Sequence, residues 1–325
     1  MLVANEVIQS RVHALRMNLD KWGYPNTALT NHDSADFGKL TGFFDVLLVD
    51  APCSGEGLFR KSPAAAGEWL EANTGLCVAR QGRILANAIP LLKPGGLLIY
   101  ATCTFNPAEN SRNVEQLLHG GTFDICDIKT EKSWGVEVRD LGYQFYPHKV
   151  KGEGFFMACL RKRGVEAPVT IQKNVNFDGW RRLRSKERNL LHSWISELDA
   201  LEIFEKPNGE LVAFHADLLP DYQHLALALR KRAFGTSIGK LKRTNFIPSH
   251  ALALSGWVPG IVPFVELEKE QALRFLRKET LALEQAPKGW CLARFESTII
   301  FPRIGVSGCR FCLKKDHPLR WSWKW

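Results

Sequence analysis

The sequence of 325 residues contains no apolar run approaching the roughly 20 residues that a membrane span needs. Its first residues, Met1 to Ser10, also lack the basic stretch and apolar core of a secretory signal. Apolar residues make up 45% of the chain. This content excludes a wholly disordered chain and a collagen-like polymer. We therefore expect a soluble, cytoplasmic protein that is long enough for two or three domains.

Closely spaced cysteines are absent from most of the chain, and no internal repeat is found. Six of the eight cysteines are widely spaced and mostly lie inside apolar segments, namely Cys53, Cys77, Cys103, Cys126, Cys159 and Cys291. This usage is typical of a reducing compartment, where cysteines are buried thiols or carry chemistry instead of forming disulfides.

Acidic residues are scarce in the second half of the chain. Residues 1–150 carry 14 basic and 16 acidic side chains, a net charge of −2, whereas residues 151–325 carry 29 and 18, a net charge of +11. A basic excess on its own describes solubility and electrostatic steering, but its confinement to one half suggests a polyanionic partner.

The first 165 residues alternate short β-type runs with helical periodicity, which is typical of a doubly wound α/β domain. We expect strands at 2–6, 27–31, 43–49 and 97–102, and helices at 7–22 and 76–92. The apolar run 43–49 predicts a strand buried on both faces. Lys93-Pro94-Gly95-Gly96 predicts a turn, Asn106-Pro107 a helix start, and residues 145–149 with 154–161 an antiparallel pair.

The second half predicts a different architecture of α+β basic modules. A linker near Arg163 to Gln172 is followed by expected helices at 179–198 and 266–285 and an expected strand at 290–295. The domain boundaries we predict are 1–165, 166–238 and 239–325.

Three carboxylates lie at or just after successive strand ends, at Glu6, Asp33 and Asp50. The carboxyl edge of an open α/β sheet is where such folds bind ligands. Any one of these acids is more often a helix cap or a solvated loop residue, but the three together favour a nucleotide-type site.

Two cysteines follow two of the buried strands, in Asp50-Ala51-Pro52-Cys53-Ser54-Gly55 and in Thr102-Cys103-Thr104-Phe105-Asn106-Pro107. Strands separated by one crossover helix often lie side by side, so both thiols should open into one cleft. A lone cysteine is usually an inert apolar side chain, but turns of this composition are poor places for inert packing. A thiolate here could act as a nucleophile.

These two strings, with Gly57 after the first and Ala108-Glu109-Asn110 after the second, resemble the Nol/Nop/Sun family of S-adenosylmethionine-dependent RNA cytosine-5 methyltransferases. The closest likeness is to members that act on bacterial ribosomal RNA, and it extends from residue 2 through Cys159 and more loosely to about Glu296. The resemblance implies a Rossmann-like methyltransferase sheet, S-adenosylmethionine as cofactor and a role in rRNA processing.

The resemblance also implies roles for individual residues. Cys103 would be the nucleophile that adds to carbon 6 of cytosine, and Cys53 would help to release the product. Asp50 would contact the cytosine edge and could also touch the cofactor, Glu6 would bind the ribose, and Asp33 would lie near the adenine. The target base must be unpaired or flipped out.

For the basic half, the resemblance implies a family-specific middle domain and a PUA-like RNA-binding domain. The RNA-binding residues we expect are Arg181, Arg182, Arg184, Lys240, Lys242 and Arg243, although each one alone could equally belong to a solvated helix face. We expect a monomer with RNA, such as ribosomal RNA or a ribosomal subunit, as its partner.

The family's first strand and Gly-rich loop should lie directly before Leu2, where this sequence starts. The hypothesis is therefore an N-terminally incomplete methyltransferase that binds its cofactor weakly or not at all, and the alternative function is a catalytically incomplete RNA-binding remnant. A thiol redox enzyme or cysteine hydrolase is disfavoured, because no histidine falls in either cysteine turn.

The C-terminal tail departs from the family after Glu296. Cys309, Cys312 and His317 supply at most three of the usual four zinc ligands, so we expect no metal site. The alternation of cations and aromatics from Arg320 to Trp325 could stack on bases, but a frayed or aberrant tail is favoured.

Overall fold

A computed structural model describes residues 1–61, 63–68, 71–165, 177–230, 232–277, 279, 281, 283 and 289–302. The chain divides into two compact units, one of residues 32–171 and one that joins residues 1–31 to residues 172–325. The predicted domain boundaries at residues 165 and 238 stay predictions. Within the described ranges, no helix has the length and apolar character needed to cross a membrane.

The unit of residues 32–171 is built on a mixed six-stranded sheet in the order β3-β4-β8-β7-β6, with β5 paired to β8. Its strands are β3 (Phe44–Asp50), β4 (Leu92–Thr102), β5 (Phe123–Ile125), β6 (Glu137–Arg139), β7 (Gly142–Phe145) and β8 (Phe155–Lys162). Its α-helices are α2 (Pro63–Glu68), α3 (Glu71–Ala88) and α4 (Ser111–His119). Short 3-10 helices lie at η1 (Ser34–Lys39), η2 (Glu56–Leu58), η3 (Ile89–Leu91) and η4 (Lys132–Trp134).

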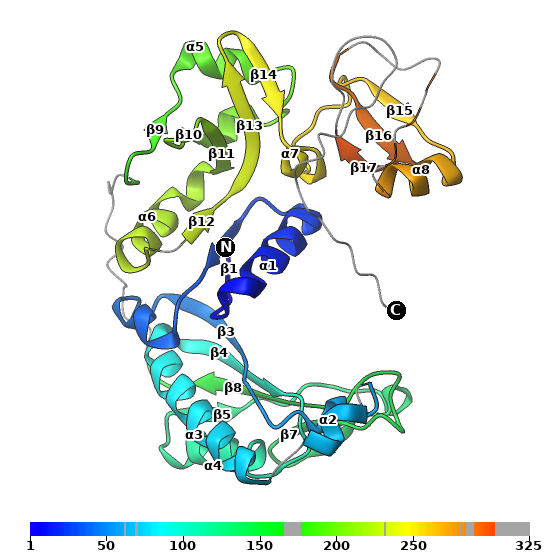
Figure 1. Ribbon diagram of the computed structural model, residues 1–325. Coiled ribbons are helices and arrows are strands. Elements are labelled where there is room, and N and C mark those ends of the chain that lie inside the picture. Colours follow the sequence, from blue (N-terminus) through cyan, green and yellow to red (C-terminus); the bar gives the residue numbers. More distant parts are fainter. Residues whose placement is uncertain are drawn as a thin grey trace. The chain divides into compact units, whose positions relative to one another are not determined.

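Helices α3 and α4 cover one face of this sheet (Figure 1). The core between the helices and the sheet contains Leu85 and Ala88 of α3, Val114 and Leu117 of α4, and Tyr100 of β4. Strands β3 and β4 are parallel, with Val49 opposite Tyr100 and Asp50 opposite Ala101. Their carboxyl ends therefore meet at one edge of the sheet, as the sequence predicted for the strands around 43–49 and 97–102.

The prediction that the strand of residues 43–49 is buried on both faces is wrong. Val46 is 53% exposed and Leu48 is 66% exposed. The physical reason is the position of β3, which is the edge strand of its sheet and has only β4 beside it. The helices cover the side of the sheet that holds Val49, so Val46 and Leu48 on the opposite face are left to solvent.

Two local predictions in this unit also need correction. The turn predicted at Lys93-Pro94-Gly95-Gly96 is not found between a helix and a strand, because these residues lie inside β4. Gly95 has φ 77° there, and the pairing register between β3 and β4 shifts. Helix α4 begins at Ser111, not at Asn106. Asn106 instead starts a hydrogen-bonded turn, because its side chain accepts from the Ala108 N–H at 2.9 Å and its carbonyl from the Asn110 N–H at 3.1 Å. The antiparallel pair predicted for residues 145–149 and 154–161 forms as β7 with β8, but the first strand lies earlier than predicted, since β7 ends at Phe145 and a turn follows it.

The second unit contains three sheets, in the orders β1-β2-β12, β14-β13-β11-β10-β9 and β15-β16-β17. The first has β1 (Leu2–Asn5), β2 (Thr27–Thr30) and β12 (Arg232–Phe234), and the second has β9 (Arg181–Arg182), β10 (Leu201–Glu205), β11 (Glu210–His215), β13 (Thr236–Lys242) and β14 (Asn245–Pro248). The third has β15 (Phe264–Glu266), β16 (Leu292–Phe295) and β17 (Thr298–Pro302). The helices are α1 (Gln9–Trp22), α5 (Ser185–Arg188), α6 (Leu219–Ala228), α7 (His250–Leu254) and α8 (Lys269–Leu276), with η5 (Asn189–Leu191), η6 (Leu198–Ala200) and η7 (Ala216–Leu218).

The predicted helix of residues 179–198 is wrong, since this segment forms β9 followed by the single turn α5 and the 3-10 helix η5. Strand β9 pairs with β10, and Arg181 and Arg182 bind carboxylates there, so partners distant in sequence override the helical pattern. The helix predicted at 266–285 is shorter, as α8 starts after its Glu268 cap and ends at Leu276. Strands near residues 2–6, 27–31 and 290–295 and the helix near 7–22 are confirmed.

Candidate active site

The two cysteine turns meet where β3 and β4 end. The Ala51 N–H donates to the Ala101 carbonyl at 2.9 Å, so the two strands stay paired up to the point where each turn begins. The Sγ atoms of Cys53 and Cys103 lie 2.8 Å apart, and the Cys103 N–H points to Cys53 Sγ at 3.2 Å. Both cysteines are half-buried and free. The structure therefore brings together the two thiols that the sequence placed at equivalent strand ends.

The contact between the two thiols shifts their pKa values in opposite directions. The hydrogen bond to Cys103, followed by burial, raises the pKa of Cys53 above its ordinary value. The same hydrogen bond, with Cys53 as donor, lowers the pKa of Cys103, against the opposing effects of burial and of the Asp50 charge. Cys103 is thus the more acidic thiol of the pair, which makes it the stronger candidate nucleophile.

The three candidate acids stand in different surroundings. Asp50 is the last residue of β3, and its side chain is exposed. The charge of Asp50 raises the pKa of the neighbouring Cys103. Asp33 caps η1 by accepting from the Ala35 N–H, and it binds Arg83 through both oxygens at 2.7 and 3.1 Å. Because the hydrogen bonds from Arg83 favour the ionised form, they lower the pKa of Asp33.

Glu6 belongs to the other compact unit, just after β1. One of its carboxylate oxygens accepts from the Ile8 N–H at 2.8 Å, and the other lies 3.7 Å from Arg11. The structure thus places Asp50, Cys53 and Cys103 together, with Asp33 in the same unit and Glu6 in the other.

A buried carboxylate, Glu109, links the two cysteine turns, and the sequence prediction missed it. Its side chain is fully buried and accepts from the Ser54 N–H at 2.9 Å, from the Ser54 hydroxyl at 2.5 Å and from Gln81 at 2.9 Å. In the sequence, Glu109 has the spacing of a helix-capping acid after Asn106, and that interpretation hides it. An acid with apolar strand residues on one side and a cysteine turn nearby is the signal that could have indicated it.

The Cys103 turn is also held by the segment that follows Cys53. The Phe105 N–H donates to Glu56 at 3.1 Å, and the Gly57 N–H donates to the Cys103 carbonyl at 2.9 Å. The Gly57 carbonyl in turn accepts from the Gly154 N–H at 2.9 Å, in the loop before β8. Both glycines are buried, so the backbone of three segments packs directly behind Cys103.

The six basic residues predicted to bind RNA fall into two groups. Three are held by acids, since Arg181 pairs with Glu187 and Glu205, Arg182 with Glu202, and Arg184 with Glu187. Lys240 donates to the main chain of Asn208 at 3.1 Å, while Lys242 and Arg243 are exposed at the turn between β13 and β14. The second group therefore offers freer cations to a phosphate backbone than the first.

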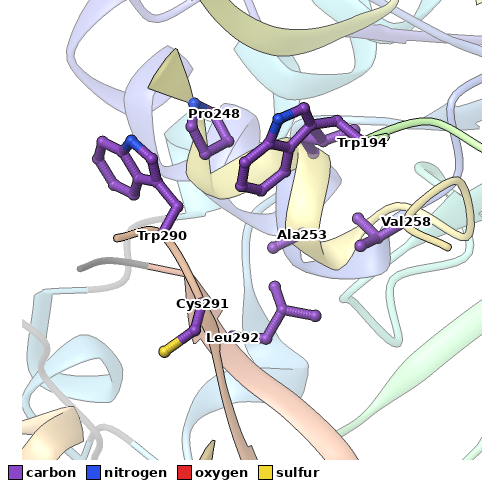
Figure 2. A pocket seen from close by; sticks show the side chains of 8 residues that line it. Trp194, Pro248, Ala253, Val258, Trp290, Cys291 and Leu292 are labelled. Carbon is purple, nitrogen blue, oxygen red and sulfur yellow. The ribbon is translucent and has the colours of Figure 1, made fainter. Parts of the chain in front are cut away.

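A small apolar pocket lies in the second unit between α7 and the start of β16. Figure 2 shows the indoles of Trp194 and Trp290 near Pro248, above Ala253 and Leu292. No charged side chain lines this space. The pocket therefore lacks the groups needed to hold a charged cofactor, and we interpret it as a gap in apolar packing.

Among the residues that the structure describes, no cluster of His, Cys, Asp or Glu could hold a metal. Cys309, Cys312 and His317 lie outside those residues.

Comparisons with known proteins find that this chain is similar to ribosomal RNA methyltransferases. The model of the 16S rRNA methyltransferase RsmB/F family matches residues 1–161, and that of the RsmF PUA domain matches residues 262–300. Ribosomal RNA small subunit methyltransferase F of Pectobacterium atrosepticum is 40% identical over 174 residues, which cover 52% of this chain and 36% of that protein. Its counterpart in Shewanella loihica is 31% identical over 327 residues, covering 91% of this chain and 62% of that protein.

Among solved structures, this chain is similar to a methyltransferase homologue from Pyrococcus horikoshii, with 28% sequence identity and a TM-score of 0.42. The match covers 49% of this chain and 52% of that one. The chain spans between about a third and two thirds of the length of the curated relatives it matches.

With its mixed α/β sheet and these two family matches, the chain contains a methyltransferase domain and a C-terminal PUA domain. The chain belongs to the RsmB/F family of 16S rRNA methyltransferases, which are enzymes. Relatives named ribosomal RNA small subunit methyltransferase F match this chain over most of its own length.

Proposed function

We propose that this chain carries the catalytic machinery of an S-adenosylmethionine-dependent RNA cytosine-5 methyltransferase that acts on RNA of the small ribosomal subunit in the cytoplasm. The observation that carries the proposal is the contact of Cys103 with Cys53 beside Asp50. It supplies two thiols, of which Cys103 is the more acidic, and a carboxylate at the carboxyl edge of the sheet. The names of the curated relatives support the substrate class.

The two carboxylates proposed to contact S-adenosylmethionine, Glu6 and Asp33, belong to different units and are considered one at a time. A carboxylate has about four acceptor positions. Glu6 uses one for Ile8, so it retains acceptors for ribose hydroxyls. Asp33 uses all four, for Arg83 twice and for Ala35 and Ser34 once each, so an adenine amino group would have to replace one of these donors. When bound, the cofactor supplies an electrophilic methyl group on a sulfonium sulfur.

The residues of the cysteine turns would then act on the base. Carbon 5 of cytosine is too weak a nucleophile by itself, so the Cys103 thiolate first forms a bond to carbon 6. Asp50, at the cytosine edge, favours protonation of ring nitrogen 3, which accepts the electron pair and gives an enamine nucleophilic at carbon 5. After carbon 5 gains its methyl group, water takes the proton from carbon 5, the electron pair left behind re-forms the double bond between carbons 5 and 6, and the Cys103 sulfur leaves as a thiolate. Cys53 assists this release.

Methyl transfer to RNA is the direct test of this function. The chain should transfer a tritiated methyl group to small ribosomal subunit RNA that lacks the modification, and the label should be recovered as 5-methylcytosine. Calorimetric titration with S-adenosylmethionine separates the two hypotheses from the sequence. Transfer together with micromolar binding supports a working enzyme, whereas RNA binding without either supports a remnant that only binds RNA.

The basic residues predict a graded salt dependence of RNA binding. Each phosphate contact to single-stranded RNA contributes about 0.7 to the slope of log K against log salt. The double variant Lys242→Gln, Arg243→Gln should therefore lower that slope by about 1.4. The matched pair Arg182→Gln, Arg184→Gln should lower it less, because acids already hold these arginines. Filter-binding titrations at several salt concentrations check the ranking, and the reverse order would assign the RNA contact to the arginines.

A further inference from the structure

Glu109 is a fully buried carboxylate that makes three hydrogen bonds and accepts in each of them. Its partners are the backbone and the hydroxyl of Ser54 and the amide of Gln81, and no cation is among them. A carboxylate in this position would be strongly destabilising if its donors were absent, because a buried polar group without a hydrogen-bond partner loses its hydration without compensation. The surroundings of Glu109 are therefore built around it.

The donors that reach Glu109 all control the turn of Cys53. Ser54 follows Cys53 directly, and both its N–H and its hydroxyl are fixed by Glu109. Gln81 also donates to the Pro52 carbonyl at 2.9 Å, so the residue on the other side of Cys53 is tied to the same carboxylate through α3. Since the Ser54 hydroxyl proton is directed at Glu109, the 2.9 Å contact between Ser54 and Thr104 has Thr104 as its donor.

We propose that Glu109 is a positioning residue that clamps the Pro52-Cys53-Ser54 turn against Cys103, so that the Cys53 S–H remains hydrogen-bonded to the Cys103 sulfur. Glu109 comes from the turn that carries Cys103, and its three bonds hold the turn that carries Cys53. The distance between the two sulfurs is therefore set by one side chain that touches neither of them. This inference rests on the proposed function only where it treats Cys103 as the nucleophile.

The charge and the clamp of Glu109 have opposite effects on Cys103, which makes them separable. As a nearby anion, Glu109 raises the pKa of Cys103, whereas the hydrogen bond from Cys53 lowers it and is the larger effect. Removing the carboxylate charge alone would make Cys103 more acidic. Losing the clamp would make it less acidic. The ionisable groups that face the thiol pair are Asp50 from β3, Cys77 from α3, Tyr100 from β4 and Glu109 itself.

The test measures how fast iodoacetamide alkylates Cys103 and Cys53 from about pH 5 to about pH 10, by mass spectrometry of the separate peptides. In the unmodified chain, Cys103 should react as a thiol of depressed pKa and Cys53 slowly. In Glu109→Gln, the rate at Cys103 near pH 7 should fall about tenfold, which corresponds to a pKa higher by about one unit. A rate at or above that of the unmodified chain overturns the proposal, because a charge effect alone would produce it.

The double variant Cys53→Ala, Glu109→Gln locates the route of the effect. Cys53→Ala alone should slow Cys103 as Glu109→Gln does, and adding Glu109→Gln should not slow it further. A further loss would mean that Glu109 acts on Cys103 by another path and would overturn the proposal. Glu115→Gln makes the same charge change on the exposed face of α4 and should leave the rate unchanged.

Ser54→Ala keeps the measurement decisive if Glu109→Gln does not fold, as judged by circular dichroism. It alters no charge and leaves the Ser54 N–H bonded to Glu109, so the rate at Cys103 should fall about threefold, less than for loss of the whole clamp. An unchanged or faster rate in a folded Ser54→Ala chain overturns the clamp. The readout uses neither RNA nor S-adenosylmethionine, so failure of methyl transfer would contradict the proposed function without affecting this result.

Discussion

Replacing Cys103 with alanine should abolish methyl transfer to RNA and prevent any covalent protein–RNA adduct, whereas replacing Cys53 with alanine should let an adduct accumulate. Removal of a covalent nucleophile commonly costs on the order of 10⁴-fold or more in rate, because the first bond cannot form. We expect this role for Cys103 because the hydrogen bond from Cys53 lowers the pKa of its thiol. With Cys53 absent, the adduct can still form, more slowly, but its breakdown lacks the thiol that assists release.

Denaturing gel electrophoresis of labelled RNA measures the adduct, and tritium transfer measures the product. Cys126→Ala is the matched control, because Cys126 is a free, half-buried thiol of the same unit and takes no part in the proposed chemistry. An adduct in Cys103→Ala but not in Cys53→Ala would exchange the roles of the two cysteines. Adducts in neither variant, with transfer intact in both, would exclude thiol chemistry altogether.

The strands and the meeting of the two thiols could be predicted from the sequence because both are local properties. Apolar runs end at Asp50 and at Thr102, and one crossover between them predicts neighbouring parallel strands. The exposure of Val46 and Leu48 could not be predicted in the same way. It depends on what lies beside β3 in space, and the apolar run reads the same for an edge strand as for a central one.

The role of Glu109 and the structure of the basic segment were not predictable, because both depend on distant partners. Gln81 reaches Glu109 from 28 residues away, so only the folded chain distinguishes a buried clamp from a capping acid. Similarly, Arg182 finds Glu202 on β10, 20 residues further on, and the strand pairing that results replaces the expected helix. Tertiary contacts such as these override local propensity.

Gly57→Ala should destabilise the unit of residues 32–171 by about 2–3 kcal/mol and also impair the site. A methyl group on Gly57 would lie 2.2 Å from the Gly154 carbonyl oxygen and 2.8 Å from the Cys103 carbonyl oxygen. Both neighbours are backbone atoms, which cannot rotate away as the end of a side chain can. The segments must therefore separate, and the bond from the Gly57 N–H to the Cys103 carbonyl must lengthen, moving the nucleophile from its place beside Cys53 and Asp50.

Gly82→Ala is the matched control for this substitution, because nothing lies within 4 Å of the added methyl group in the exposed middle of α3. Alanine favours a helix over glycine by about 1 kcal/mol, so this variant should be more stable than the unmodified chain and fully active. Hydrogen exchange of the amides in β3, β4 and β8 measures the stability of the unit of residues 32–171 itself. A single melting curve would not do so, because the chain has two units that can unfold separately. Gly57→Ala should raise exchange throughout these strands and Gly82→Ala should lower it. Equal protection in the two variants would mean that the backbone behind Cys103 yields without cost, and that its close packing does not hold the nucleophile.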